Sequence, residues 1–254
     1  MASRLALVFL LGVLFATPLF AIKSFDFFYL VLMWPGAYCA QSKCCLPTTG
    51  LPAEDFFLRG LWTYNGTDST NMKPVTKCIK NSPFYINQLS NMSEELNSYW
   101  SNIRCPSTSP KSSWKSTWKT WGVCSGMNET DYFQFALELR AEADLLSFLS
   151  KKGIYPDYNL YNLTDIQSAI AEGIGVTPDI RCSKGPFGKF QLYEVYICVN
   201  KVGKFVECPG FQGFTCSSSI LFHPFHDWMF NKTSTSAIDS NHIKMPISWS
   251  DLHD

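Results

Sequence analysis

The sequence predicts a disulfide-bonded domain that contains both β-strands and α-helices, and three observations lead to this prediction. Residues 24–34 form a short, apolar, aromatic-rich run, which is typical of a strand buried on both faces. Residues 129–152 repeat apolar side chains at the spacing of a helix. The chain also has ten cysteines, an even number that indicates a disulfide framework in a secreted protein.

Length and composition favour one domain. The 254 residues are 46% hydrophobic, which is sufficient for one sizeable core. The formal net charge is zero, so the chain as a whole lacks the basic excess that is usual in nucleic-acid-binding proteins.

The N-terminus has the features of a secretory signal peptide. Arg4 precedes an apolar run from Leu5 to Ala16, and Ala21 stands at a plausible cleavage point. We therefore predict a signal peptide over residues 1–21 and expect a secreted protein, or one carried to a vacuole by the same pathway. No later stretch reaches 18 uncharged apolar residues, so we expect no membrane partner. Five N-x-S/T sequons are candidate glycosylation sites: Asn65, Asn91, Asn128, Asn162 and Asn231.

The two N-terminal elements are predicted as strands. The first, residues 24–34, is ended by Pro35-Gly36. The second covers residues 55–62 and leads into a turn.

Helices are predicted in the middle of the chain. Residues 83–103 have Pro83 in the first turn and apolar side chains every three or four residues. Trp114, Trp118 and Trp121 could share one helical face. Residues 129–152 form the clearest helix, with acidic residues at its start and Lys-Lys-Gly at its end.

The C-terminal half adds a short helix and a hairpin. Thr164 and Gln167 have the spacing of a capping box for a helix that runs through Glu172. Residues 191–200 alternate apolar side chains, turn at 201–203 and return over 204–208, which brings Cys198 and Cys208 close enough to pair. Metal binding is a rival use of the cysteines, but the chain contains no C-x-x-C pair.

Three motifs resemble those of the ribonuclease T2 family. Gly60-Leu61-Trp62 matches the family's F-x-I-H-G-L-W-P, and the run from Trp114 to Cys124 matches W-x-H-E-W-x-K-H-G-T-C at its Trp, Gly and Cys positions. The stretch from Trp34 to Cys39 is similar to the Q-Q-W-P-x-x-Y-C of plant S-like ribonucleases, with Leu32 and Met33 in place of the two Gln.

This resemblance implies an α+β fold in which a central antiparallel sheet packs against several helices, with five disulfides. The implied pairs are Cys39–Cys44, Cys45–Cys105, Cys78–Cys124, Cys182–Cys216 and Cys198–Cys208. We expect the family domain over residues 22–225 and a poorly ordered extension over residues 226–254.

The resemblance also implies that the catalytic groups are missing. The family cuts RNA without a metal, using two histidines because imidazole gives and takes protons near neutral pH. Here Arg59 and Trp121 stand at the two histidine positions, and Thr117 and Thr120 replace a Glu and a Lys. The four histidines all lie at the C-terminal end, at positions 223, 226, 242 and 253.

Each replacement has two interpretations. Arg59 can anchor a phosphate or act as a salt-bridge partner. Trp121 can stack on a base or fill the vacated cleft, and we favour the second. Lys119, with Lys111 and Lys115, can form a small nucleic-acid patch or a solvated helix face, and we favour the face.

We therefore expect a secreted relative of the plant S-like ribonucleases that lacks efficient catalysis and has a storage, defence or binding role. A weak endoribonuclease that makes 2',3'-cyclic phosphates is the alternative. We predict a monomer without a cofactor. We also expect no metal site, because His223, His226 and Asp227 lack a fourth ligand. RNA is a candidate partner, bound weakly, and a protein partner is another.

Overall fold

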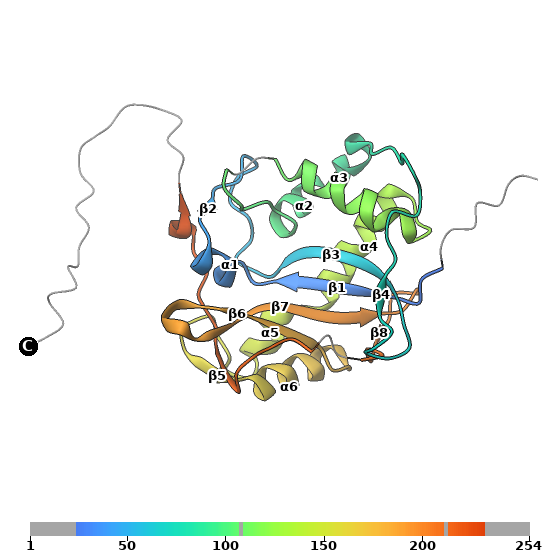
Figure 1. The fold of residues 1–254 in the computed structure, drawn as a ribbon. Coiled ribbons are helices and arrows are strands. Elements are labelled where there is room, and N and C mark those ends of the chain that lie inside the picture. Colours follow the sequence, from blue (N-terminus) through green and yellow to red (C-terminus); the bar gives the residue numbers. More distant parts are fainter. Residues whose placement is uncertain (1–23, 107–108, 211–212, 232–254) are drawn as a thin grey trace, which may run out of the picture.

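An eight-stranded sheet organises the protein. The computed structural model describes residues 24–106, 109–210 and 213–231. The main path of the sheet is β4-β3-β1-β7-β9-β5, and β6 and β8 also pair with β7 (Figure 1). Its strands are β1 (Phe27–Met33), β3 (Phe57–Asn65), β4 (Lys73–Pro74), β5 (Leu160–Asn162), β6 (Asp179–Lys184), β7 (Phe190–Val199), β8 (Phe205–Val206) and β9 (Ser219–Leu221).

The α+β class is confirmed, with one correction to the topology. We predicted an antiparallel sheet, but the sheet is mixed because β9 pairs with β7 in parallel at Gln191 and Leu221. The other pairings of this sheet within the described ranges are antiparallel. A second sheet joins β2 (Cys44–Cys45) to β10 (Phe230–Asn231), also in parallel.

The predicted first strand is confirmed as β1, which is buried on both faces. Phe28, Leu30 and Leu32 belong to the main core, which the helices cover. Phe27, Tyr29 and Val31 point to the other face, into a smaller cluster with Tyr196 and Cys198 of β7. This second face also carries the side chains of the candidate site described below.

The helices are α1 (Pro35–Gln41), α2 (Ser93–Tyr99), α3 (Lys111–Thr120), α4 (Glu129–Glu142), α5 (Leu145–Ser150) and α6 (Leu163–Ile174), with 3-10 turns at η1 (Ile86–Met92), η2 (Gly122–Cys124), η3 (Pro186–Gly188) and η4 (Asp227–Met229). In Figure 1, α2 and α3 lie above the sheet, α4 passes behind it, and α5 and α6 lie below it. Helix α1 was not predicted, because Pro35-Gly36 was interpreted only as the end of the first strand, whereas Pro35 stands in the first turn of this helix.

Three predicted helix boundaries were wrong. The helix predicted over residues 83–103 is a 3-10 turn followed by α2, because Tyr85 is extended and donates its N–H to the Glu129 carboxylate. The helix predicted over residues 129–152 is broken, because Ala143 leaves the helical region and the Asp144 side chain accepts from Ser147 N to start α5. The N-cap of α6 is Asn162, so Thr164 forms no capping box.

Five disulfides cross-link the fold, and all five pairs match the prediction: Cys39–Cys44, Cys45–Cys105, Cys78–Cys124, Cys182–Cys216 and Cys198–Cys208. Cys44 and Cys45 are adjacent, and each bonds to a different partner.

The described chain continues past the predicted boundary at residue 225. Asp227–Met229 form η4, and β10 then pairs with β2. The predicted signal peptide over residues 1–21 and the part of the predicted extension after residue 231 lie outside the described residues. None of the helices within the described ranges is long and apolar enough to cross a membrane.

Candidate functional site

A β-bulge sets the direction of Arg59. On β1, Val31 is paired with Gly60 and Leu32 with Leu58, so Arg59 is an extra residue on β3 without a partner on β1. Bulges of this kind bend a strand and redirect a side chain, often beside a functional site. The Arg59 side chain is 46% exposed and its Nε lies 3.3 Å from the Glu194 carboxylate.

Glu194 is a buried carboxylate that holds two arginines. Its side chain is 1% exposed. One oxygen meets Arg59, the other lies 3.0 Å from Arg181 and also accepts the Tyr196 hydroxyl at 3.0 Å. A buried charge requires such partners, because an unpaired one is costly. Burial, and then the Glu194 charge, raise the pKa of Tyr196. Burial lowers the pKa of Arg181, but the charge and hydrogen bond of Glu194 outweigh this effect, so the pKa of Arg181 is raised.

Arg59 borders a pocket of about 280 Å³, which we call the Arg59 pocket. Thr117 of α3 and Met33 of β1 line it, together with the loop that ends at Arg104. Two guanidinium groups therefore face this space, and no carboxylate of the described residues lines it. The arrangement favours an anionic ligand, since guanidinium binds carboxylate and phosphate well.

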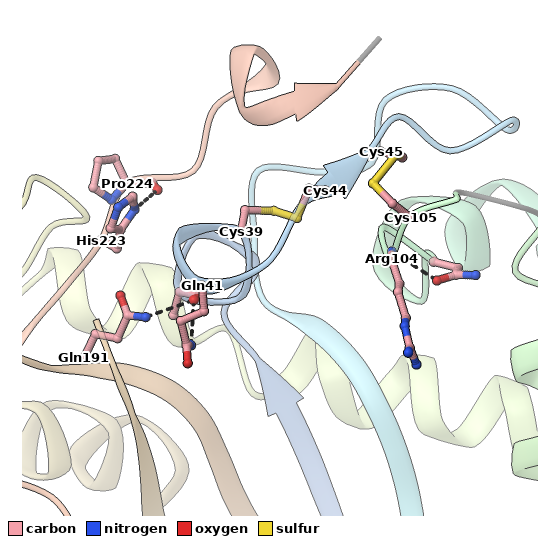
Figure 2. Close-up of a disulfide and its surroundings, with 11 residues drawn as sticks. Cys39, Gln41, Cys44, Cys45, Arg104, Cys105, Gln191, His223 and Pro224 are labelled. Atoms are coloured by element: carbon pink, nitrogen blue, oxygen red, sulfur yellow. Dashed lines mark hydrogen bonds between the residues drawn. A yellow bond between two sulfur atoms is a disulfide. The ribbon is translucent and has the colours of Figure 1, made fainter. Parts of the chain in front are cut away.

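Adjacent cysteines fasten two walls of this pocket (Figure 2). Cys45 bonds to Cys105, which directly follows Arg104, and Cys45 N donates to Ile103 O at 2.9 Å. Cys44 bonds to Cys39 of α1, the helix that carries Tyr38 to the pocket. The pocket wall is thus held by covalent bonds as well as by packing.

Trp121 lies across two aromatic rings of β3. Its ring centroid is 5.4 Å from that of Trp62 and 6.1 Å from that of Tyr64, with interplanar angles of 18° and 11°. The side chain is only partly buried, whereas Trp114 and Trp118 are in the core. Packing is therefore observed for Trp121, and part of its ring remains open to solvent.

The glycines of the two motifs have a steric role beside their tryptophans. A methyl group at Gly60 would overlap the Trp62 indole, and one at Gly122 would overlap the Trp118 indole. Each glycine therefore allows an indole to lie flat against the backbone.

The remaining predicted residues lie around this centre. Lys119, Lys111 and Lys115 are exposed on α3. Thr120 does not line the Arg59 pocket; its carbonyl accepts the Lys77 N–H at 2.8 Å.

The histidines lie elsewhere. His223 is 5% exposed and its Nδ1 lies 2.7 Å from Pro224 O (Figure 2). Burial lowers its pKa. His226 is exposed, and His242 and His253 lie outside the described residues. No imidazole of the described ranges lines the Arg59 pocket, and these ranges contain no cluster of three metal-ligating side chains.

The sequons differ in accessibility. Asn91, Asn128 and Asn162 are exposed, and Asn128 caps α4 by accepting from Asp131 N. Asn65 is partly buried, with a buried Oδ1 that has no hydrogen-bond partner among the described residues. The side chain of Asn231 is outside the described residues.

The ribonuclease T2 family profile matches residues 25–208. The chain belongs to the ribonuclease T2 family. It is 42% identical over 229 residues to extracellular ribonuclease LE of Solanum lycopersicum. This match covers 88% of this chain and 98% of the relative. It is 30% identical over 185 residues to a ribonuclease-like storage protein of Panax ginseng, covering 72% of this chain and 74% of that protein.

The fold is also similar to that of RNase NT, whose crystal structure was solved in complex with 5'-AMP. The TM-score is 0.75 at 39% identity, over 80% of this chain and 100% of the other. This likeness agrees with the mixed sheet and helices described above.

The sequence analysis missed Glu194, Arg181, Arg104 and Tyr38. A signal for Glu194 was present, because it is the only charged residue in the apolar strand of residues 191–200. A charge in a buried strand requires a partner, and such a partner is a candidate for the surface of a site.

Proposed function

We propose that this ribonuclease T2 homologue binds RNA in the Arg59 pocket without cutting it efficiently. One observation carries the proposal: Arg59 and Thr117 line this pocket, Trp121 stacks on Trp62 of β3, and none of these three side chains exchanges a proton at neutral pH.

The chemistry of RNA cleavage explains the expected loss. A base must take the ribose 2'-proton, and an acid must protonate the leaving oxygen. Arg59 remains protonated, and Trp121 is only a hydrogen-bond donor. Glu194 does not replace the base, because its buried carboxylate is occupied by two arginines and a tyrosine. Each missing proton-transfer role lowers a rate by about 100- to 10,000-fold.

Binding has separate support. Arg59 and Arg104 supply positive charge to a pocket that no carboxylate of the described residues lines. A related fold binds 5'-AMP. The open part of the Trp121 ring offers a surface on which a base can stack. The apolar N-terminal run and the extracellular relative support secretion, and the exposed sequons support glycosylation at Asn91, Asn128 and Asn162.

Storage is the second candidate function. It is favoured by the likeness to the ginseng storage protein and by the internal contacts of Arg59 and Trp121, since Arg59 is ion-paired and Trp121 is stacked. A storage protein needs no ligand, whereas the binding proposal requires saturable binding of 5'-AMP. Titration calorimetry with 5'-AMP separates the two, and the absence of saturation contradicts the binding proposal.

Cleavage is tested with the double variant Arg59→His/Trp121→His. We expect no cyclic-phosphate products from the wild type and detectable products from this variant. The matched control is Arg59→Gln/Trp121→Gln, which removes the same side chains without adding imidazole. Cleavage by the wild type at the rate of an active relative would overturn the proposal, because another residue would then transfer the protons.

A further inference from the structure

A second pocket lies on the other side of Tyr38, between α1 and β6. It has a volume of about 410 Å³ and is lined by Tyr38, Gln41, Ser42, Arg181, Lys184 and Tyr193, among others. We call it the Arg181 pocket. Tyr38 lines both this pocket and the Arg59 pocket, so the two are neighbours.

The charges of the Arg181 pocket favour an anion. Arg181 and Lys184 are both exposed, and no carboxylate of the described residues lines the pocket. Lys184 forms no ion pair with any carboxylate of the described ranges. Arg181 gives one nitrogen, NH1, to Glu194. A guanidinium has five N–H donors, so most of those on Arg181 remain for a ligand.

The position of Arg181 is fixed by its neighbours. Its guanidinium carbon lies 5.8 Å from the Tyr193 ring centroid and 5.7 Å from that of Phe214. Tyr193 is the extra residue of a second bulge, where Arg181 pairs with Glu194 and Cys182 with Leu192. A cation held in this way loses little conformational entropy when it binds a ligand.

A hydrogen-bond network supports the wall beside it. Gln41 donates to Ser183 at 2.7 Å and to Ala37 O at 3.0 Å. Gln191, which is fully buried, donates to the same Ala37 carbonyl at 2.9 Å. Figure 2 shows the two glutamine side chains reaching towards each other from α1 and β7. This network ties α1, on one side of the pocket, to β6 and β7.

Glu194 connects the two pockets. One of its oxygens holds Arg59 at the first pocket and the other holds Arg181 at the second. The single negative charge of this carboxylate balances only one of the two guanidinium charges, so a net positive charge remains. Arg104, Arg59, Arg181 and Lys184 thus supply positive charge to two adjoining spaces.

We propose that the Arg181 pocket binds a phosphate group of the nucleic-acid strand whose adjoining nucleotide occupies the Arg59 pocket. Arg181 supplies directional donors and Lys184 a mobile point charge. This inference rests on the proposed RNA binding and adds a second binding site for the strand. A mononucleotide that occupies the Arg59 pocket has no neighbouring phosphate to reach the Arg181 pocket.

The test compares a 2'-O-methyl tetranucleotide, which cannot be cleaved by this chemistry, with 5'-AMP. Lys184→Gln is the main variant, because Lys184 makes no ion pair within the described ranges that its replacement would disrupt. Arg181→Gln is the second, and Lys204→Gln, at the exposed hairpin turn, is the matched control. Affinity is measured at several salt concentrations.

The expected result is a smaller salt dependence for the tetranucleotide. When a protein loses its contact with one phosphate of a single strand, the negative slope of log K against log salt becomes smaller in magnitude by about 0.7. Lys184→Gln should show this change, while its affinity for 5'-AMP equals that of Lys204→Gln. If Arg181→Gln does not fold, Lys184→Gln still decides the question.

The failures of the two proposals are distinguishable. If 5'-AMP does not bind to the wild type, the proposed function fails and this inference fails with it. If both bind and Lys184→Gln has the slope of Lys204→Gln, only the Arg181 pocket is refuted.

Discussion

Replacing Glu194 by Gln tests the charge network at the centre of the site. The substitution keeps the shape of the side chain and leaves Tyr196 with an oxygen acceptor. It removes the negative charge that holds Arg59 and Arg181. The Gln amide group also places N–H donors beside guanidinium donors, so at least one hydrogen bond is broken.

The magnitude follows from exposure. A hydrogen bond to a charged group contributes about 1.5–3 kcal/mol when it is well buried. The two arginines are 46% and 47% exposed, so water replaces much of each interaction. Each of the two ion pairs of Glu194 then contributes about 0.5–1 kcal/mol to the free energy of unfolding. We expect Glu194→Gln to lower the free energy of unfolding by about 2 kcal/mol once one unsatisfied buried group is added.

Urea unfolding of four proteins measures this: the wild type, Glu194→Gln, Arg59→Gln and the double variant. Arg59→Gln should cost less than Glu194→Gln, because Arg181 and Tyr196 still satisfy the carboxylate. The double variant should be less destabilised than the sum of the single ones. If Glu194→Gln is as stable as the wild type, or if the two effects simply add, the network does not hold Arg59 as described.

Three further predictions concern the surrounding structure. Gly60→Ala should cost about 1–3 kcal/mol and reduce the near-UV circular dichroism, because the added methyl group displaces Trp62 from its stack; unchanged spectra and stability would refute this. Removing the Cys198–Cys208 bond should lower the free energy of unfolding by about 2.5 kcal/mol, and removing Cys45–Cys105 should lower it by about 4 kcal/mol. The bonds span 10 and 60 residues, and a longer loop restricts the unfolded chain more. Urea unfolding of the paired Cys→Ser variants checks the order. His223 has a lowered pKa in the folded state, so its contribution to stability is complete above the unfolded pKa of about 6.5 and declines as the pH falls below it; His223→Phe should flatten the melting temperature between pH 7 and 5.

Local patterns in the sequence were sufficient for β1, β3 and the hairpin of β7 and β8, but the remaining short strands and β6 were not predicted. The apolar run of β1 reflects its burial on both faces, which a single sequence records directly. The alternation over residues 191–200 located β7, although most of this strand is also buried on both faces. The five disulfide pairs came from the family likeness, because spacing alone does not select a connectivity. The parallel pairing of β9 with β7 was missed, since it depends on residues far apart in the chain.

The errors in the helices and in the site have local physical causes. Asp144 breaks the long amphipathic pattern because its carboxylate caps a new helix. Pro35 was interpreted as a terminator, although proline also suits the first helical turn. Arg59 could be placed near a cleft from its motif, but its bulge and its pairing with Glu194 depend on how three strands meet.

The adjacent cysteines of β2 have a practical consequence for recombinant material. An isomer in which Cys44 and Cys45 exchange their partners would have the same mass and the same number of disulfides. It would also shift β2 by one residue, which turns alternate side chains to the opposite side of a strand. Such molecules would retain the large sheet but present a misplaced wall around Arg104. Peptide mapping of the disulfides should therefore precede any conclusion that a purified sample does not bind.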